Sequence, residues 1–387
     1  MNTYDTIITP PTDDDTATIQ AVLDAGGIFT IPHKTVCRIT QSLVITKDYS
    51  GIVSDGSGVL YMPASCFNTI SLAFAERYGP QTVGVYIHGL LEAPWTPVIH
   101  PVLKGVRIIG EAVQGLFTNP VVVQNAQQVK IIDNEIANFS LGVGIRIQSC
   151  TFGSVVERNY IHDFLDNTTG WNNADVPQIT GIEIDNDIWN NLSSDQLSVC
   201  NNTIRNMLVG SDFLYKYGYQ TDGINVVRNS TFNTTILGNH IDTCAEGIDN
   251  FGSHTAIANN VIINAYNFGI KMIHGASFAS VVGNVVTMYG LAGIVCSGSP
   301  TINDPCVDDV VISGNNVSFG NYGGNWGSQD NAAIMIGLNG TAPPVNIFVT
   351  GNILRPANGN YALNITPNSG VTIGSNLAFP GLLGVSR

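Results

Sequence analysis

The sequence predicts an all-β protein, a single-stranded parallel β-helix that follows a short N-terminal capping helix. Two observations predict this fold. An apolar segment that ends in asparagine recurs along the chain, and a second short strand containing a Gly-Ile pair alternates with it. A period of about 22 residues also fits leucine-rich repeats. Those need an L-x-x-L-x-L pattern and a helical segment, and neither is present, so the β-helix explains the repeat better.

The first recurring element is the apolar strand that ends in asparagine. Its shortest repeat spacings are 21 to 25 residues. Because the coils of a β-helix stack about 4.8 Å apart in parallel register, equivalent side chains fall above one another. We expect each asparagine to adopt the left-handed conformation at a corner and to bond the asparagine of the next coil. The asparagines of this predicted ladder are Asn134, Asn159, Asn202, Asn239, Asn260, Asn284, Asn315, Asn352 and Asn376.

The second element is the Gly-Ile strand, as in "TGIEID" (180–185), "DGINVV" (222–227) and "EGIDNF" (246–251). Its isoleucine should face the interior, so that the next residue faces outward. The predicted outward row reads Arg146, Glu183, Asn225, Asp249, Lys271, Val295, Met335 and Asn364. The residues before the glycine form a neighbouring row of Val143, Thr180, Asp222, Glu246, Phe268 and Ala292.

Composition and charge exclude several classes of function. The net charge is −14, from 15 basic and 29 acidic residues, which disfavours nucleic acid as a partner. No apolar window is long enough for a membrane span. The N-terminal segment "MNTYDTIITPPTDDD" lacks the pattern of a signal peptide. The seven cysteines are widely spaced and odd in number, which predicts free thiols.

The N-terminus predicts a cap for the first coil. "TATIQAVLDAGG" reads as a short helix with Ile19, Val22 and Leu23 on one face and Gly26 as its stop. Together with the strands that follow it, "DDDTATIQAVLDAGGIFTIPHKTVCRITQSLVI" resembles the entry segment of pectate-lyase-like right-handed parallel β-helix proteins. The resemblance implies one β-helix domain over residues 1–387. Within it we expect a cap and entry strand at 1–30, coils at 31–376 and a C-terminal cap or tail at 377–387.

Unequal spacings place inserted loops along the chain, at 162–179, 187–196, 206–221, 299–308 and 319–331. Three of these insertions end directly before a Gly-Ile strand, so we expect them to stack along one edge and wall a groove. Aromatic rings beside a groove suit the C–H faces of sugars. The aromatic residues predicted to bind substrate are Trp171, Tyr215, Tyr217, Tyr219 and Trp326.

Carboxylates concentrate in adjacent coils of the Gly-Ile series. Asp222 and Glu246 occupy the equivalent place before glycine in successive coils, and Asp249 and Glu183 lie in the outward row. Glycoside hydrolysis needs two carboxyl groups at a defined separation. Neighbouring coils give about 5 Å and next-but-one coils give roughly 10 Å. Crowded carboxylates also raise each other's pKa, as a general acid requires.

"QTDGINV" (220–226) resembles the N-T-D-G-[IL]-[DN]-[IV] segment of polygalacturonase-type glycoside hydrolases, whose aspartate is catalytic. The resemblance implies a catalytic role for Asp222. Glu246 matches one member of that family's next acidic pair, whereas the family's later histidine motif has no counterpart. We expect Asp222 and Glu246 to form the acid/base pair and Asp249 and Glu183 to assist. The residues expected to contact substrate on this face are Lys271, His274, Asn225 and Asp185.

The predicted function is therefore binding and hydrolysis of an extracellular polysaccharide, without a metal or cofactor. One alternative is a polysaccharide lyase or epimerase, in which Lys271, Arg146, Glu183, Asp185 and Asp187 could supply a base and hold Ca²⁺. The other is a non-catalytic glycan-binding protein resembling phage tailspikes. That alternative predicts a virion-associated or extracellular location and a homotrimer, with Val295, Ile273 and Met335 as candidate contacts.

Overall fold

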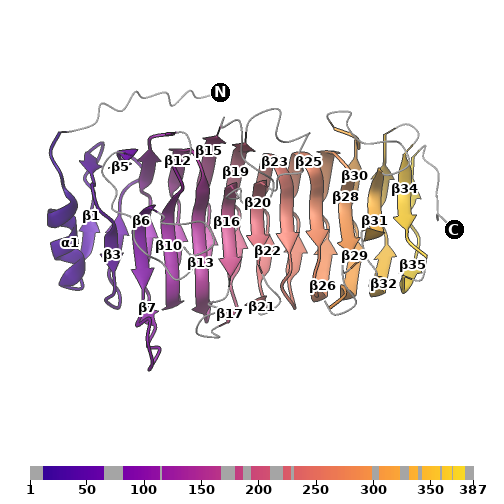
Figure 1. Cartoon of the computed structure of the whole chain (residues 1–387), viewed down its shortest axis with the longest axis horizontal. Helices are drawn as coiled ribbons and strands as arrows, with labels where there is room; N and C mark the ends of the chain where they lie inside the picture. Colours follow the sequence, from indigo (N-terminus) through magenta and orange to yellow (C-terminus); the bar gives the residue numbers. More distant parts are fainter. Residues whose placement is uncertain are drawn as a thin grey trace.

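In the computed structural model the described residues form one helix and three faces of short parallel strands, stacked along the long axis (Figure 1). The fold is the predicted right-handed parallel β-helix. The helix α1 (Thr16–Asp24) lies at the N-terminal end of the stack. The structure describes residues 12–64, 82–113, 116–166, 179–185, 193–209, 221–227, 231–298, 305–322, 331–338, 342–357, 360–367 and 369–379.

The first face is a 12-stranded parallel sheet that carries the asparagine-terminated repeats. Its strands are β1 (Ile28–Thr30), β4 (Gly51–Val53), β8 (Val102–Lys104), β11 (Lys130–Ile132), β14 (Val155–Glu157), β18 (Ser198–Cys200), β22 (Thr235–Leu237), β24 (Ala256–Ala258), β26 (Ser277–Val282), β29 (Asp308–Ser313), β32 (Val345–Thr350) and β35 (Val371–Ile373).

The second face follows directly after the ladder asparagines. Its strands are β2 (Val36–Arg38), β5 (Val59–Met62), β9 (Arg107–Gly110), β12 (Glu135–Phe139), β15 (Tyr160–Asp166), β19 (Thr203–Val209), β23 (His240–Asn250), β25 (Val261–Met272), β27 (Val285–Tyr289), β30 (Asn316–Ser318), β33 (Ile353–Arg355) and β36 (Leu377–Ala378).

The third face carries the Gly-Ile repeats and includes the C-terminal halves of β23 and β25, which bend from the second face into the third. Its other strands are β3 (Leu43–Ile45), β6 (Thr82–His88), β10 (Thr118–Gln127), β13 (Gly142–Thr151), β16 (Ile179–Asp185), β20 (Thr221–Val226), β28 (Ala292–Ser297), β31 (Ala332–Leu338) and β34 (Tyr361–Ile365). Two short additions are β7 (Val98–Ile99), beside β10, and the pair β17 (Ser194–Asp195) and β21 (Thr231–Phe232).

The three faces refine the predicted coil. The sequence indicated at least two strands per repeat, whereas the structure has three in most coils. The segments 162–166 and 206–209, predicted as the starts of inserted loops, are the ends of strands β15 and β19. The interior isoleucines are confirmed, since Ile182, Ile224 and Ile248 of the third face are fully buried in one continuous core. The six cysteines among the described residues are free thiols, as expected.

The asparagine ladder is confirmed along its whole predicted length. Each side-chain Nδ2 donates to the Oδ1 of the next asparagine at 2.9 to 3.0 Å, from Asn134 through to Asn376. One detail of the prediction is wrong, because the left-handed residue is the one before the ladder asparagine. Arg158 and Gly238, for example, have φ of 53° and 67°. That residue turns the corner, so the asparagine is free to point inward along the stack.

The helical cap is confirmed. Ile19 and Leu23 are buried in the core, and Val22 is half-buried beside them. Gly26 follows the helix with φ of +76°, a left-handed stop that favours glycine. The helix therefore covers the open end of the first coil with its apolar face.

The glycines of the third face form a column at the bend between the second and third faces. A Cβ on Gly247 would lie 2.4 Å from the carbonyl oxygen of Gly269 and 2.5 Å from Cγ2 of Ile262. The same kind of contact recurs at Gly181 and Gly223. At these three glycines the stacked coils therefore approach too closely for a side chain.

We expect Gly247→Ala to lower the free energy of unfolding by about 2 kcal/mol, because the added methyl overpacks a fixed bend. Denaturant unfolding of the purified variant measures this change. Ala258→Ser, at an outward position of the first face, is a suitable control and should change stability by less than about 0.5 kcal/mol. Equal stabilities of the Gly247→Ala variant and the wild type would contradict the close-approach explanation.

Candidate active site

Both predicted rows of the third face occur in the structure. Glu183, Asn225, Asp249 and Lys271 are successive partners in register along the outward row. In the row before glycine, Asp222 pairs directly with Glu246. Parallel stacking of near-identical coils therefore brings acidic residues that are distant in sequence onto adjacent strands.

The bend at the glycine column decides which way the two rows face. Strict alternation would place Asp222 and Ile224 on the same side of the strand. The bend at Gly223 interrupts the alternation, so Asp222 shares the outer side with Asn225. The Nδ2 of Asn225 accordingly donates to Oδ2 of Asp222 at 2.9 Å. Glu246 and Asp249 have the same relation in the next coil, where both contact Lys271.

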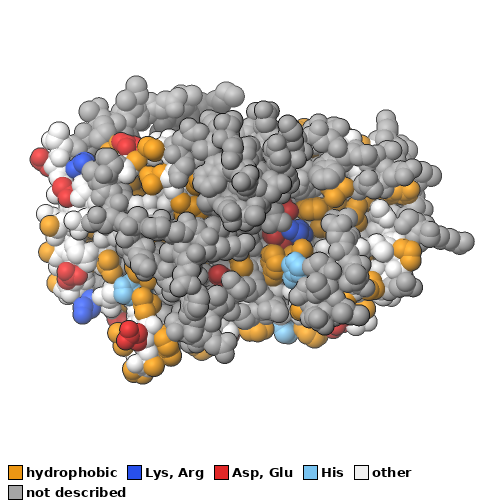
Figure 2. Space-filling model, in the orientation of Figure 1, with side chains coloured by type: hydrophobic (Ala, Val, Ile, Leu, Met, Phe, Trp, Pro, Cys, Tyr) orange, Lys and Arg blue, Asp and Glu red, His pale blue; other side chains and the backbone are white. Residues whose placement is uncertain are grey.

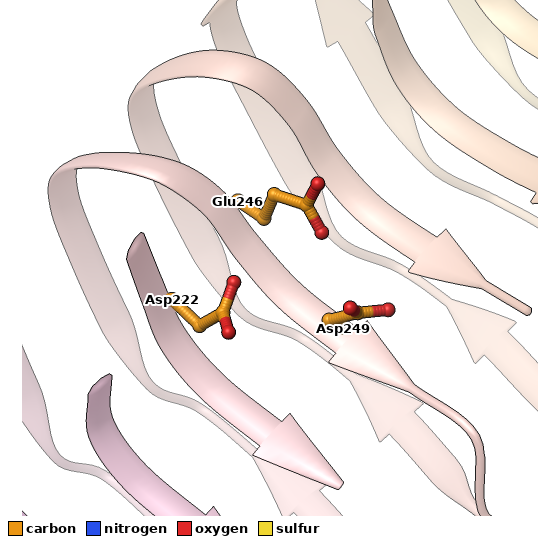
Figure 3. Close-up of side chains that lie close together, drawn as sticks. All are labelled: Asp222, Glu246 and Asp249. Carbon is orange, nitrogen blue, oxygen red and sulfur yellow. The ribbon is translucent and has the colours of Figure 1, made fainter. Parts of the chain in front are cut away.

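Asp222, Glu246 and Asp249 form a three-carboxyl cluster, with one oxygen of each lying within 4.8 Å of the others. Figure 3 shows the three side chains pointing toward one another from two adjacent strands. The Nζ of Lys271 lies 3.0 Å from Oε2 of Glu246 and 3.2 Å from Oδ2 of Asp249. We call these three carboxyl groups and Lys271 the acidic cluster.

The acidic cluster is buried. Asp222 and Asp249 are 0% exposed, Glu246 is 1% exposed and Lys271 is 5% exposed. Oδ1 of Asp222 and Oδ1 of Asp249 have no hydrogen-bond partner among the described residues. Burying an unpaired polar oxygen costs free energy, which is a usual feature of functional sites.

Burial and mutual repulsion shift the pKa values of the acidic cluster. Burial, together with the charges of Glu246 and Asp249, raises the pKa of Asp222 well above its usual value. Burial also raises the pKa of Glu246 to about 7 despite the opposing charge of Lys271. Burial also raises the pKa of Asp249 above its usual value, although the charge of Lys271 opposes the shift. Burial disfavours the charge on Lys271, but Asp249 and Glu246 outweigh it and raise the lysine pKa.

These shifts have a common physical cause. Three ionised carboxylates facing one ammonium would leave two negative charges uncompensated in a buried site. Burial and repulsion therefore favour protonation of the cluster, most strongly at Asp222, whereas Lys271 favours ionisation of Glu246 and Asp249. Groups with different proton affinities thus lie side by side, as acid/base chemistry requires.

The remaining predicted residues of this face lie outside the acidic cluster. Glu183 pairs with the buried Arg146, with Nε to Oε1 at 3.0 Å, so its charge is already compensated. Asp185 is buried at the C-terminal end of β16. His274 follows β25 and stacks on Phe251 with ring centroids 5.5 Å apart.

Two residues that were expected to contact substrate are bonded to the carboxyl groups of this face. Lys271 is engaged by Glu246 and Asp249, and Asn225 by Asp222. The sequence contained the signal for this, because in each case the partners are vertical neighbours or belong to the same Gly-Ile strand.

The predicted aromatic subsites, Trp171, Tyr215, Tyr217, Tyr219 and Trp326, lie outside the described residues, as does Asp187.

The row continues beyond Lys271 as a buried apolar cluster. Val295 and Met335, predicted as outward contacts of a trimer, are 0% and 4% exposed and pack with Leu291, Ala292 and Ala332. They are therefore not available as an intersubunit contact, and that part of the prediction is wrong. Ile273, the third candidate, is half-buried.

At the molecular surface, Figure 2 shows basic and acidic side chains beside each other near the middle of this face, with a histidine and hydrophobic side chains close by. No helix in the described part of the chain is long and apolar enough to cross a membrane.

Comparison with solved structures places the chain among parallel β-helix proteins. It superposes on the Streptococcus pneumoniae surface protein and adhesin PfbA with a TM-score of 0.64 and 12% identity, over 97% of this chain and 96% of that one. The Dettilon tailspike protein gp208 gives a TM-score of 0.64 and 16% identity, over 95% of this chain and 65% of that one.

A mutant tailspike protein of E. coli bacteriophage HK620, in complex with a pentasaccharide, gives a TM-score of 0.54 and 11% identity, over 96% of this chain and 62% of that one. The chain thus spans somewhat less than two thirds of the length of these tailspikes. At such identities the likeness is one of fold alone. No protein-family model and no curated protein sequence matches the chain.

Proposed function

We propose that this protein binds a glycan across the third face and hydrolyses it at the acidic cluster. The observation that carries the proposal is the buried group of Asp222, Glu246 and Asp249, whose oxygens approach within 4.8 Å and whose pKa values differ. Glycoside hydrolysis uses one protonated and one ionised carboxyl group on either side of the scissile bond.

The roles follow from the proton affinities. Asp222, whose pKa burial raises well above its usual value, is the acid and donates its proton to the glycosidic oxygen. Glu246 acts as the ionised partner, with Lys271 stabilising its charge against repulsion from Asp249. Asn225 positions Asp222 through the hydrogen bond from its Nδ2. Glu183 lies in the neighbouring coil, where an ion pair with Arg146 compensates its charge.

The spacing favours retention of anomeric configuration. Retaining enzymes place their carboxyl groups about 5 to 5.5 Å apart, whereas inverting enzymes need about 6.5 to 9.5 Å to admit a water. In the acidic cluster one oxygen of each carboxyl group lies within 4.8 Å of the others, so the groups are in close proximity and we assign the retaining mechanism on that ground. In this mechanism Glu246 attacks the anomeric carbon, the leaving oxygen takes the proton of Asp222, and water then releases the sugar. Proton NMR of the first-formed anomer tests this assignment.

A panel of purified polysaccharides is the direct test of the proposal, with reducing ends and unsaturated-product absorbance read together. Reducing ends without absorbance support hydrolysis, and absorbance at unsaturated uronate wavelengths identifies a lyase. Absence of any product across the panel would contradict both enzymatic functions, hydrolase and lyase. The pentasaccharide complex of the structurally similar tailspike makes bacterial surface glycans the first choice for the panel.

Two other functions have specific support. The three carboxyl groups could help a lyase or epimerase, in which Ca²⁺ would neutralise a uronate and Lys271 or Arg146 would act as base. The burial of Asp222 and Asp249 favours a non-catalytic glycan-binding protein, and the structurally similar PfbA is described as an adhesin. Binding to a glycan without turnover would support the latter.

We also propose homotrimeric assembly and an extracellular or virion-associated location, the latter in keeping with the tailspikes among the similar structures. Light scattering of the purified protein measures the mass of the assembly directly, and a monomeric mass would remove the trimer.

Stability should depend on pH through Glu246. Because its pKa is raised from 4.5 to about 7 on folding, the folded chain binds more protons than the unfolded chain between these values. The free energy of unfolding should therefore fall as pH rises through this window, by about 3 kcal/mol from this residue. Glu246→Gln should remove that part of the decline. Denaturant unfolding of both proteins at pH 4.5, 6 and 7.5 measures the difference, and parallel pH profiles would contradict the assignment.

A further inference from the structure

The acidic cluster has the ligand chemistry of a cation site. Besides its three carboxyl groups, Oδ1 of Asn225 is buried and has no hydrogen-bond partner among the described residues, like Oδ1 of Asp222 and Oδ1 of Asp249. These are hard oxygen ligands on two adjacent strands, of the type that Ca²⁺ prefers. Acidic groups alone do not make a site, but buried oxygens without partners indicate that a positive group belongs beside them.

The cation present beside these oxygens is the ammonium of Lys271. Its Nζ contacts Glu246 at 3.0 Å and Asp249 at 3.2 Å, and it lies 5.7 Å from the ring centroid of Phe268. Lys271 comes from β25, the strand next to the one that carries both carboxylates. Its side chain is 7% exposed, so it is held inside the cluster and does not extend into solvent.

We propose that Lys271 is the resident cation of this site, tethered to the fold, and that removing its charge converts the acidic cluster into a site for a divalent metal ion. Two physical reasons favour the lysine in the native protein. A tethered ammonium has a high effective concentration at the carboxylates. A metal ion would also have to displace Lys271 and leave a buried ammonium without partners.

Truncating the lysine removes both reasons that favour it over a metal ion. The carboxylates then lack a counter-ion, and the space that the side chain filled becomes available beside them. Repulsion among the three carboxylates destabilises the variant unless protons or a metal ion neutralise them. The inference concerns the same site as the proposed hydrolysis, but it is tested by ion binding and does not need turnover.

The test measures Ca²⁺ binding to purified Lys271→Ala and wild type by isothermal titration calorimetry and by the shift of the unfolding midpoint in CaCl₂. We expect the variant to bind Ca²⁺ with a Kd below about 1 mM, at least ~10-fold more tightly than the wild type. Its unfolding midpoint should rise with CaCl₂, while that of the wild type stays constant. Adding Asp222→Asn to the variant should weaken the binding.

Arg146→Met is the matched control. It also removes a buried cation from the same face, but from an ion pair with Glu183 and not from a three-carboxyl cluster, so it should gain no Ca²⁺ affinity. Lys271→Met keeps the length of the side chain and serves if the alanine variant folds poorly. The proposal is overturned if wild type binds Ca²⁺ as tightly as the Lys271 variants. It is also overturned if the Lys271 variants bind Ca²⁺ no more tightly than Arg146→Met and if 10 mM CaCl₂ stabilises them no more than it stabilises Arg146→Met.

Discussion

Asp222→Asn is expected to lower the rate of glycan cleavage by about 10²- to 10⁴-fold, the usual contribution of a general acid. The variant should fold normally. Because burial favours the protonated form of Asp222, the asparagine amide has nearly the shape and charge of that form. Its Oδ1 can still accept the hydrogen bond from Asn225. Activity and stability should therefore separate in this variant, with kcat reduced and the free energy of unfolding nearly unchanged.

The control for this experiment lies on the same strand as Glu246. Asp242 belongs to the second face, is half-buried, and pairs with Arg205 at 3.3 Å. Asp242→Asn removes one negative charge from the molecule and should leave the cleavage rate within about twofold of the wild type. If Asp222→Asn retained full activity on a glycan that the wild type cleaves, the proposed acid would be wrong. The β-helix and the acidic cluster would stand unaffected.

Asn239→Ala is expected to lower the free energy of unfolding by about 4 kcal/mol, the largest effect on stability that we predict. Nδ2 of Asn239 donates to Oδ1 of Asn260 and to the carbonyl of Val199, both at 2.9 Å. Its Oδ1 accepts from the backbone and side-chain nitrogens of Asn202 at 2.9 and 3.0 Å. Truncation leaves buried polar groups on two adjacent coils without partners, each at a cost of about 1 to 3 kcal/mol.

The end of the ladder provides the comparison. Asn376 is half-buried and accepts from Asn352 at 2.9 Å, but no ladder asparagine follows it. Because solvent can satisfy the groups left behind, Asn376→Ala should cost less than half as much as Asn239→Ala. Chemical denaturation of both variants gives the ratio. Equal losses at the two positions would show that the ladder does not act through buried, unpaired groups.

The sequence predicted the fold because the same packing pattern recurs in successive coils of a repeat protein. An asparagine at one fixed place per coil has to stack on its counterpart, and all nine predicted members do so from Asn134 to Asn376. The Gly-Ile strands predicted the inward isoleucines and the register of both rows for the same reason. The third strand of each coil was missed, because short apolar segments such as β15 merge with their neighbours when read as a pattern.

The sequence by itself determined which residues become neighbours, including Asp222 beside Glu246, because parallel stacking repeats one register from coil to coil. Only the tertiary structure decided what those neighbours do. The bend at the glycine column turned Asp222 and Asn225 to the same side, and Lys271 closed on Glu246 and Asp249 instead of facing solvent. A strand pattern specifies sides by alternation. A bend, the burial of a charge and the choice of its counter-ion depend on contacts among several coils at once.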